Sequence, residues 1–182
     1  FFKCLIISHL ISCSPVSSFV SVAANAGISS KGFSASVDDV IIKAKIIKNI
    51  SSLEISNFMD ITVSVSMGEV LLTGYSNNQP GRLRVIESVW KVDEVKKVYN
   101  EILVSPGVSI AEKTEDAIFE SRIMTRLLFK SGINSNNFSV DVVDGTVFAI
   151  GLAENLEEKT NFENYLGGMK DIPKLVTIIN LK

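Results

Sequence analysis

The chain has 182 residues, of which 46% are hydrophobic and 21% charged, and its formal net charge is -2. These values are typical of one globular chain or two small domains, and they exclude a disordered or collagen-like protein. Because the sequence pI is about 5.5, no global basic field favours nucleic acid as a partner.

The side chains that carry most enzyme chemistry lie at the very start of the sequence. Both cysteines and the histidine precede residue 14: Cys4, His9 and Cys13. The remaining chain therefore lacks the residues for a disulfide framework, a Cys or His zinc site, a cysteine nucleophile or a Ser-His-Asp triad. No phosphate-binding glycine motif is present, and no pair of carboxylates recommends a hydrolase. We expect a non-enzymatic protein without a metal or cofactor.

Residues 1–12 are predicted to be a lipoprotein signal peptide. Lys3 precedes an apolar run, CLIISHLI, that is too short to span a bilayer as a helix. The run ends in LISC, residues 10–13, which resembles the bacterial lipobox, in which the cysteine thiol forms a thioether to diacylglycerol. Cys13 is thus the expected lipidation site, and several acyl chains would anchor the protein firmly. Ser14 stands where an aspartate would retain the protein in the inner membrane, which favours the periplasmic face of the outer membrane.

An alternative for the N-terminus stays open. Residues 24–26, Ala-Asn-Ala, match the A-x-A cleavage pattern of an ordinary export signal. Cleavage there would remove Cys13 and release a soluble periplasmic protein. In either case the Ser-, Ala- and Gly-rich stretch after Cys13 predicts a flexible tether over residues 13–37.

The first folded unit is predicted over residues 38–104. An amphipathic helix from Asp38 to about Ser52 has Ser36 and Asp39 in capping-box spacing, and its buried stripe is Ile42, Ile46 and Ile50. Strands over 60–66 and 70–76 flank a tight turn at 67–68. Pro80 introduces a second helix over 81–91, and residues 95–104 return as a strand.

A linker over residues 105–114 contains a Pro-Gly turn signal, and a second unit over 115–182 repeats the first. The repeat has a constant offset, since 145 - 68, 151 - 74 and 116 - 39 all equal 77. Chance rarely maintains one register over such a length, so the sequence indicates a tandem duplication. We therefore predict an α+β protein with two copies of the order helix, strand, strand, helix, strand, each a small mixed sheet packed on two helices.

This order resembles the BON domain. The residues that carry the resemblance in the first copy are Asp39, Val63, Val65, Gly68, Val70, Thr73, Gly74, Val95, Val98, Asn100 and Val104. The second copy keeps Asp116, Val140, Val142, Gly145, Val147 and Gly151, but it has Ile150 for the threonine and Thr177 for the asparagine.

The resemblance implies a lipid-anchored outer-membrane protein that binds anionic phospholipid of the phosphatidylglycerol type through its second BON domain. It also implies a role in envelope integrity and a possible partner in the outer-membrane protein assembly machinery. The alternative is a soluble periplasmic dual-BON protein of the stress-induced, chaperone-like kind that acts on protein clients.

The first helix of the second copy is the expected lipid-binding element. On a helical projection Phe119, Ile123 and Leu127 form its buried stripe. Apolar residues outside this stripe and nearby cations would bury hydrocarbon and pair with phosphate. The predicted lipid-binding residues are Ile118, Arg122, Arg126, Leu128, Phe129 and Lys130. In the alternative interpretation, the apolar ones pack against the first domain or under the linker.

Other conspicuous residues receive structural interpretations. The glycines of the two hairpins are expected to serve turns or close backbone approach: Gly68, Gly74, Gly145 and Gly151. Trp90 is expected to pack its helix on the sheet. The lysines of the first helix, at 43, 45 and 48, suggest a solvated face or a protein contact.

Overall fold

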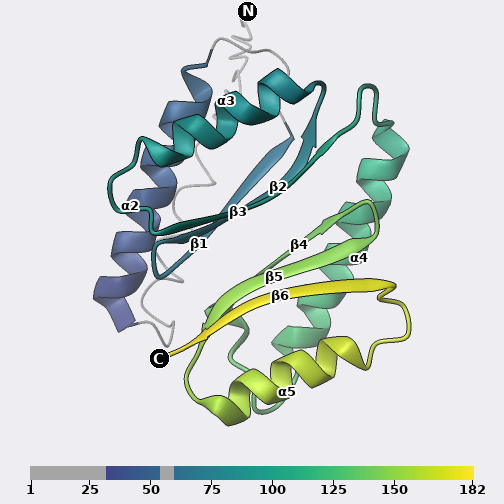
Figure 1. Ribbon diagram of the computed structural model, residues 1–182. Helices are drawn as coiled ribbons and strands as arrows, with labels where there is room; N and C mark the ends of the chain where they lie inside the picture. Colours follow the sequence, from purple (N-terminus) through teal and green to yellow (C-terminus); the bar gives the residue numbers. More distant parts are fainter. Residues whose placement is uncertain (1–31, 54–59) are drawn as a thin grey trace, which may run out of the picture.

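The computed structural model describes residues 32–53 and 60–182, with side chains from residue 37 onward. The first copy contains α2 (Gly32–Ser51), β1 (Ile61–Ser66), β2 (Glu69–Ser76), α3 (Gln79–Trp90) and β3 (Lys97–Val104). The second contains α4 (Ile110–Leu128), a 3-10 turn η1 (Ser135–Asn137), β4 (Phe138–Val143), β5 (Thr146–Ala153), α5 (Leu156–Gly167) and β6 (Lys174–Leu181). The predicted α+β class and element order are confirmed (Figure 1). The expected signal peptide and Cys13 lie outside the described residues.

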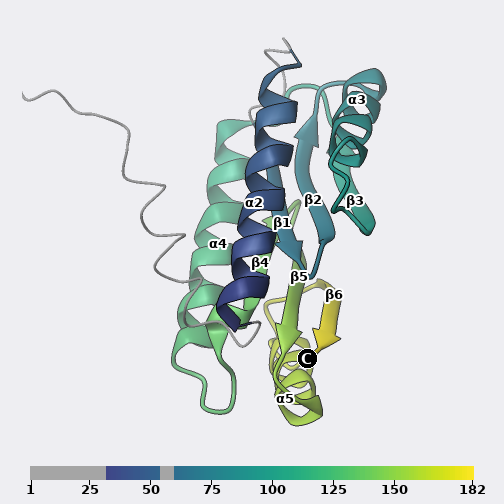
Figure 2. The ribbon, with the colours of Figure 1, turned by 90° about the vertical axis from the view of Figure 1, so that its left-hand side faces the viewer.

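Each copy contains one mixed three-stranded sheet. In the first, β2 lies between antiparallel β1 and parallel β3, and in the second, β5 lies in the same way between β4 and β6. Two helices lie against the outer face of each sheet and bury its apolar residues, α2 and α3 in the first copy and α4 and α5 in the second (Figure 2). The centres of these two cores are Ile46, Leu72 and Val85 in the first copy, and Ile123, Ala149 and Phe162 in the second. The residues predicted to form the buried side of each copy's first helix do pack into that copy's core, although Ile50 and Phe119 are only partly buried at its margin.

The inner faces of the two sheets pack against each other. A third apolar cluster joins them, formed by Leu71 of the first sheet with Val143, Phe148, Ile150 and Ile178 of the second. The molecule thus has four layers, with helices outside and the two sheets between them (Figure 1). The outer surfaces of the two helical layers therefore face in opposite directions.

A local two-fold axis relates the two domains. Ser64 Oγ donates a hydrogen bond to Asp141 Oδ2 at 3.1 Å, and these positions are equivalent in the repeat, since 141 - 64 = 77. In an isologous interface equivalent residues meet at the axis. The contacts of β1 with β5 and of β2 with β4 across the interface have the same symmetry. The duplication has therefore produced an internal pseudo-dimer.

An aspartate near the start of each copy's first helix holds the hairpin turn. The Asp39 carboxylate accepts hydrogen bonds from the backbone N–H groups of Met67 and Gly68, both at 3.0 Å. Asp116 accepts the equivalent bonds from Asp144 and Gly145, at 2.8 and 3.0 Å. All four turn residues have positive φ, between 50° and 77°. This is the type I′ conformation, for which glycine at the second position is well suited.

The other two hairpin glycines lie where strands approach closely. An added Cβ at Gly74 would stand 1.8 Å from the carbonyl oxygen of Asp60, and one at Gly151 would stand 2.3 Å from that of Asn137. Both distances are far below van der Waals contact. Any larger residue at 74 or 151 would therefore displace the start of the neighbouring strand.

Two expectations about the first copy are wrong. Its first helix begins at Gly32, earlier than predicted, so Ser36 lies inside the helix and not at its start. Asp39 is already occupied by the hairpin turn, which explains why its spacing from Ser36 has no capping role. Trp90 does not pack on the sheet: it is the last residue of α3, and 52% of its surface is exposed.

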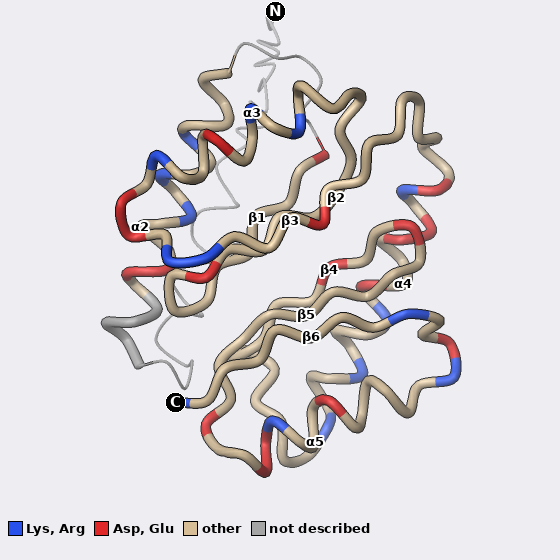
Figure 3. Tube along the Cα trace, viewed as in Figure 1, with Lys and Arg blue, Asp and Glu red and all other residues tan. Residues whose placement is uncertain are grey.

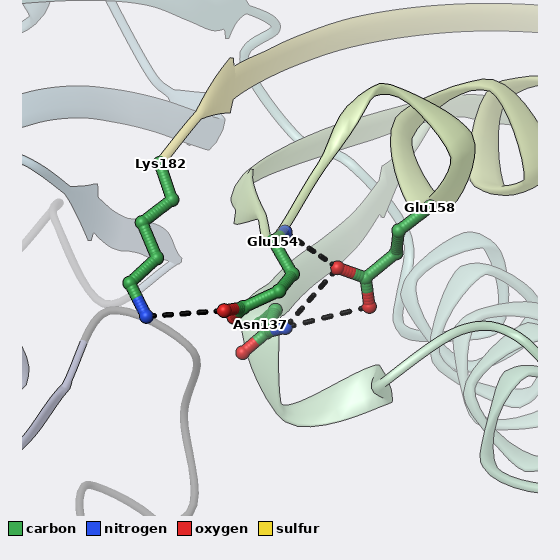
Figure 4. A network of polar contacts seen from close by, with 4 residues as sticks. All are labelled: Asn137, Glu154, Glu158 and Lys182. Carbon is green, nitrogen blue, oxygen red and sulfur yellow. Dashed lines mark hydrogen bonds and ion pairs between the residues drawn. The ribbon is translucent and has the colours of Figure 1, made fainter.

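A buried glutamate of α5 binds the segment between α4 and β4 (Figure 4). Glu158 is only 7% exposed, and its carboxylate accepts hydrogen bonds from the N–H groups of Asn134 at 2.7 Å and Glu154 at 2.6 Å. The side-chain amide of Asn137 lies 3.4 and 3.5 Å from the two carboxylate oxygens. Charge-assisted bonds of this kind satisfy the buried charge. They fix the segment that follows α4.

Candidate functional site

The candidate lipid-binding helix α4 begins earlier than the sequence suggests. Ser109 caps it: its hydroxyl accepts a hydrogen bond from the N–H of Glu112 at 3.2 Å, and the Glu112 carboxylate accepts one from the N–H of Ser109 at 2.8 Å. This reciprocal pair is a capping box. The helix therefore starts inside the expected linker, at Ile110, and includes residues 110–114. The Ser-x-x-Glu spacing was the signal that could have located this start.

The inner side of α4 is firmly fixed to its own domain and to the first one. Ile123 and Leu127 are fully buried, and Met124 packs at the margin of the core. The Tyr75 hydroxyl, from β2 of the first domain, donates to Asp116 Oδ2 at 3.2 Å and accepts from the N–H of Asp144 at 3.0 Å. Burial and the neighbouring carboxylates raise the pKa of Tyr75 to about 12, so its hydroxyl stays protonated at neutral pH.

The outer side of α4 exposes large apolar groups. Ile118 is 55% exposed, Leu128 64% and Phe129 82%, the last being the residue that follows the helix. This exposure favours an outward-facing role over the alternative interpretation, in which they pack against the first domain or under the linker. An exposed row of this kind on one helix is unusual for a monomeric soluble domain, where apolar residues are more often scattered singly.

The predicted basic residues divide into two groups. Arg126 makes a bidentate ion pair with Asp171, with Nη1 at 2.9 and 3.1 Å from the carboxylate oxygens. Lys130 Nζ lies 4.8 Å from the centroid of the Tyr165 ring, a cation–π contact. Arg122 is exposed and makes none of the ion pairs found in residues 37–53 and 60–182. Arg122 is therefore the cation of α4 most available to an external anion.

The first turns of α4 add residues that the sequence interpretation missed. Ile110 is 84% exposed and begins a shallow groove along the helix with a volume of about 440 Å³. The groove continues through Thr114 and Ala117 to Ile118 and is bordered by Lys113 and Ser121. Ile110 was missed because it was assigned to the linker. Exposed apolar residues thus occur near the start of α4 and at its end, with the polar Ser121 and Thr125 exposed between them.

Charged residues of both signs occur in both domains. Figure 3 shows lysine, arginine, aspartate and glutamate distributed over both domains. Within the described part of the chain, no helix is long and apolar enough to cross a membrane. The same residues contain no group of three or more His, Cys, Asp or Glu side chains that could hold a metal ion.

Comparison with known proteins agrees with the duplicated architecture. The BON domain family model matches residues 38–106 and 115–176. A protein of Anaplasma centrale, described as "Uncharacterized protein in gshII 5'region", is 33% identical over 147 residues, which are 80% of this chain and 96% of that protein.

Two further likenesses are more distant. Outer membrane lipoprotein DolP of Haemophilus influenzae is 27% identical over 84 residues, covering 46% of this chain and 44% of that protein. A structure of CdsD, a structural protein of the type III secretion system of Chlamydia trachomatis, has 15% identity and a TM-score of 0.30, with 79% of this chain and 61% of that chain covered. The last likeness is too weak to support any inference. Because the family match covers both copies of the repeat, the chain belongs to the BON-domain family and carries two BON domains in tandem.

Proposed function

We propose that the protein is a non-enzymatic, lipid-anchored outer-membrane protein that binds anionic phospholipid through α4 and supports envelope integrity. The observation that carries the proposal is a set of exposed apolar residues on α4 and directly after it, beside a cation that makes no ion pair in the described part of the chain. These residues are Ile110, Ile118, Leu128 and Phe129, and the cation is Arg122. The similarity to Outer membrane lipoprotein DolP supports an envelope location.

The physical argument concerns an interfacial helix. A helix that lies in the headgroup region buries its apolar side at the acyl boundary while its cations pair with lipid phosphate. The inner side of α4 is held by Ile123 and Leu127, so the helix can present its outer side without unfolding its domain. Arg126 and Lys130, which have partners of their own, contribute to phosphate binding only if they exchange those partners.

Vesicle flotation tests the helix. The full chain with Cys13→Ala, which removes acylation, is expected to float with vesicles that contain phosphatidylglycerol and less with pure phosphatidylcholine. Ile118→Glu should weaken flotation at least about tenfold, because burial of an isoleucine side chain contributes about 1.5–3 kcal/mol and a charge is added. The matched control is Leu83→Glu on α3, where the leucine is similarly exposed, at 49%. Equal flotation of the Ile118 variant and the control would refute the site.

Metabolic labelling with palmitate tests the anchor. In a bacterial host the wild-type chain should incorporate label and fractionate with the outer membrane. Cys13→Ala should remove the label and release the protein into the periplasm, since no acyl chain remains. If the wild-type chain took up no label, the soluble periplasmic alternative would replace the lipoprotein.

The first domain offers a surface for a protein partner. Leu83 and Trp90 of α3 are 49% and 52% exposed, and the helical layer to which they belong faces away from that of α4 (Figure 1). With α4 on the membrane, this surface would face the periplasm. We propose it as the side on which the outer-membrane protein assembly machinery, or protein clients in the alternative function, would bind.

A further inference from the structure

The interface between the two sheets is chemically uneven. The first sheet contributes hydroxyl groups: Ser64, Ser66 and Thr73 are at most 4% exposed. The hydroxyls of Ser66 and Thr73 find no hydrogen-bond partner among the described residues. The second sheet contributes apolar groups at the equivalent positions, Val143 and Ile150. Unpaired buried hydroxyls cost free energy, so this interface is less stable than its packing suggests.

A carboxylate lies at the local two-fold axis of this interface. Asp141 is 8% exposed, and Ser64 is its one hydrogen-bond partner in the described part of the chain. Burial is the main cause that raises the pKa of Asp141, while Ser64 and the charge of Lys43 act in the opposite direction. Glu120, whose pKa is also raised, chiefly by burial and next by Asp141, lies at the same edge and accepts a bond from the N–H of Val142 at 3.3 Å.

Lys43 and Glu120 are also equivalent in the repeat, since 120 - 43 = 77. Both act on Asp141, which accepts the hydrogen bond of Ser64. A cation and a hydroxyl of the first domain thus lie near two carboxylates of the second. The neighbouring strands β1 and β5 carry no titratable side chain. Lys43 of α2 and Glu120 of α4 are the charged groups that act on Asp141. Glu120 also faces Asp116, and it lines a pocket with Asp60, Tyr75 and Lys113.

We propose that the docking of the two BON domains is controlled by pH: the sheet interface is closed while Asp141 and Glu120 are protonated, and it loosens when both ionise. Ionisation places two negative charges at a partly buried edge, where Lys43 opposes the charge of Asp141 while Lys113, in the pocket that Glu120 lines, is already paired with Asp60. Separation of the sheets returns both carboxylates to water and releases the unpaired hydroxyls of Ser66 and Thr73. By linkage, groups that hold protons more tightly in the closed state favour closure at low pH.

Spin labels on the outer helices report this motion in the full chain. Cys4→Ser and Cys13→Ser remove the native thiols, and Leu83→Cys on α3 and Leu156→Cys on α5 attach labels at positions that are 49% and 66% exposed. Distances are measured by double electron–electron resonance at about pH 5 and about pH 8, above the ordinary carboxyl pKa of about 4. We expect a narrow distribution at the lower pH and a several-fold larger long-distance fraction at the higher pH.

Two variants test whether the charges of Asp141, Glu120 and Lys43 cause the pH-dependent opening. Asp141→Asn with Glu120→Gln keeps the shapes and removes the charges, so its distribution should stay narrow at both pH values. Lys43→Gln removes the opposing cation, so its opening should move to lower pH. An identical wild-type distribution at both pH values would overturn the proposal, and so would opening of the charge-free variant to the same extent as the wild type. The readout does not involve lipid, so its failure leaves the proposed membrane function standing.

Discussion

Single polar groups decide how tightly the domains dock, and Thr73 is the clearest case. Its side chain is fully buried and its hydroxyl has no partner in the described part of the chain, while the equivalent residue of the second copy is the apolar Ile150. Thr73→Val keeps the shape and removes the unpaired hydroxyl. We expect it to raise the free energy of unfolding by about 1 kcal/mol, measured by urea denaturation.

Thr73→Ser is the matched control for that prediction. It keeps the hydroxyl and removes a methyl group, so it should lower the free energy of unfolding by about 1 kcal/mol. Opposite signs for the two variants would assign the effect to the unpaired hydroxyl rather than to cavity volume. A valine variant that is no more stable than wild type would show that the hydroxyl has a partner, such as a buried water.

At the scale of elements, the sequence predicted type and order better than boundaries. The period of Ile42 and Ile46, and the alternation along β1 and β2, follow from burial on one face, which a local pattern records. The start of α4 also had a local signal, the Ser109 and Glu112 pair, but the preceding Pro-Gly favoured a linker there. The start of α2 had no such signal, because no Ser-x-x-Glu pair precedes Gly32.

The role of the helix aspartates could not be derived from local sequence. Asp39 and Asp116 bind backbone groups 28 and 29 residues later, across the hairpin turn. Only the fold brings these groups together. The same limit applies to the lipid-binding candidates. Apolar periodicity correctly placed Ile118 outside the core, but it could not reveal that Arg126 and Lys130 have partners far along the chain. These partners are Asp171 and Tyr165.

At the scale of the whole molecule, the two domains behave as a pseudo-dimer whose equivalent contacts have diverged. Tyr75 links the first domain to the Asp116 clamp of the second. Its counterpart by the repeat is Leu152, which has no hydroxyl. Only the Tyr75 side of the pseudo-dimer therefore has this side-chain hydrogen bond between the domains. Because the bond reaches Asp116 of α4, the first domain helps to orient the candidate membrane helix.

This link predicts a distinct alkaline transition. Because the folded state raises the pKa of Tyr75 from 10.0 to about 12, the folded state holds the phenolic proton more tightly than the unfolded state. The stability that the hydroxyl contributes is complete below about pH 10 and is lost as pH rises toward 12.

Tyr75→Phe removes the link, and it should lower the free energy of unfolding by about 1 kcal/mol at about pH 9. The N–H of Asp144 keeps its bond to Asp116 in that variant, so no buried donor is left unpaired. In urea denaturation at increasing pH, the difference between wild type and variant should shrink above about pH 10, and a constant difference up to about pH 12 would contradict the role of the Tyr75 hydroxyl.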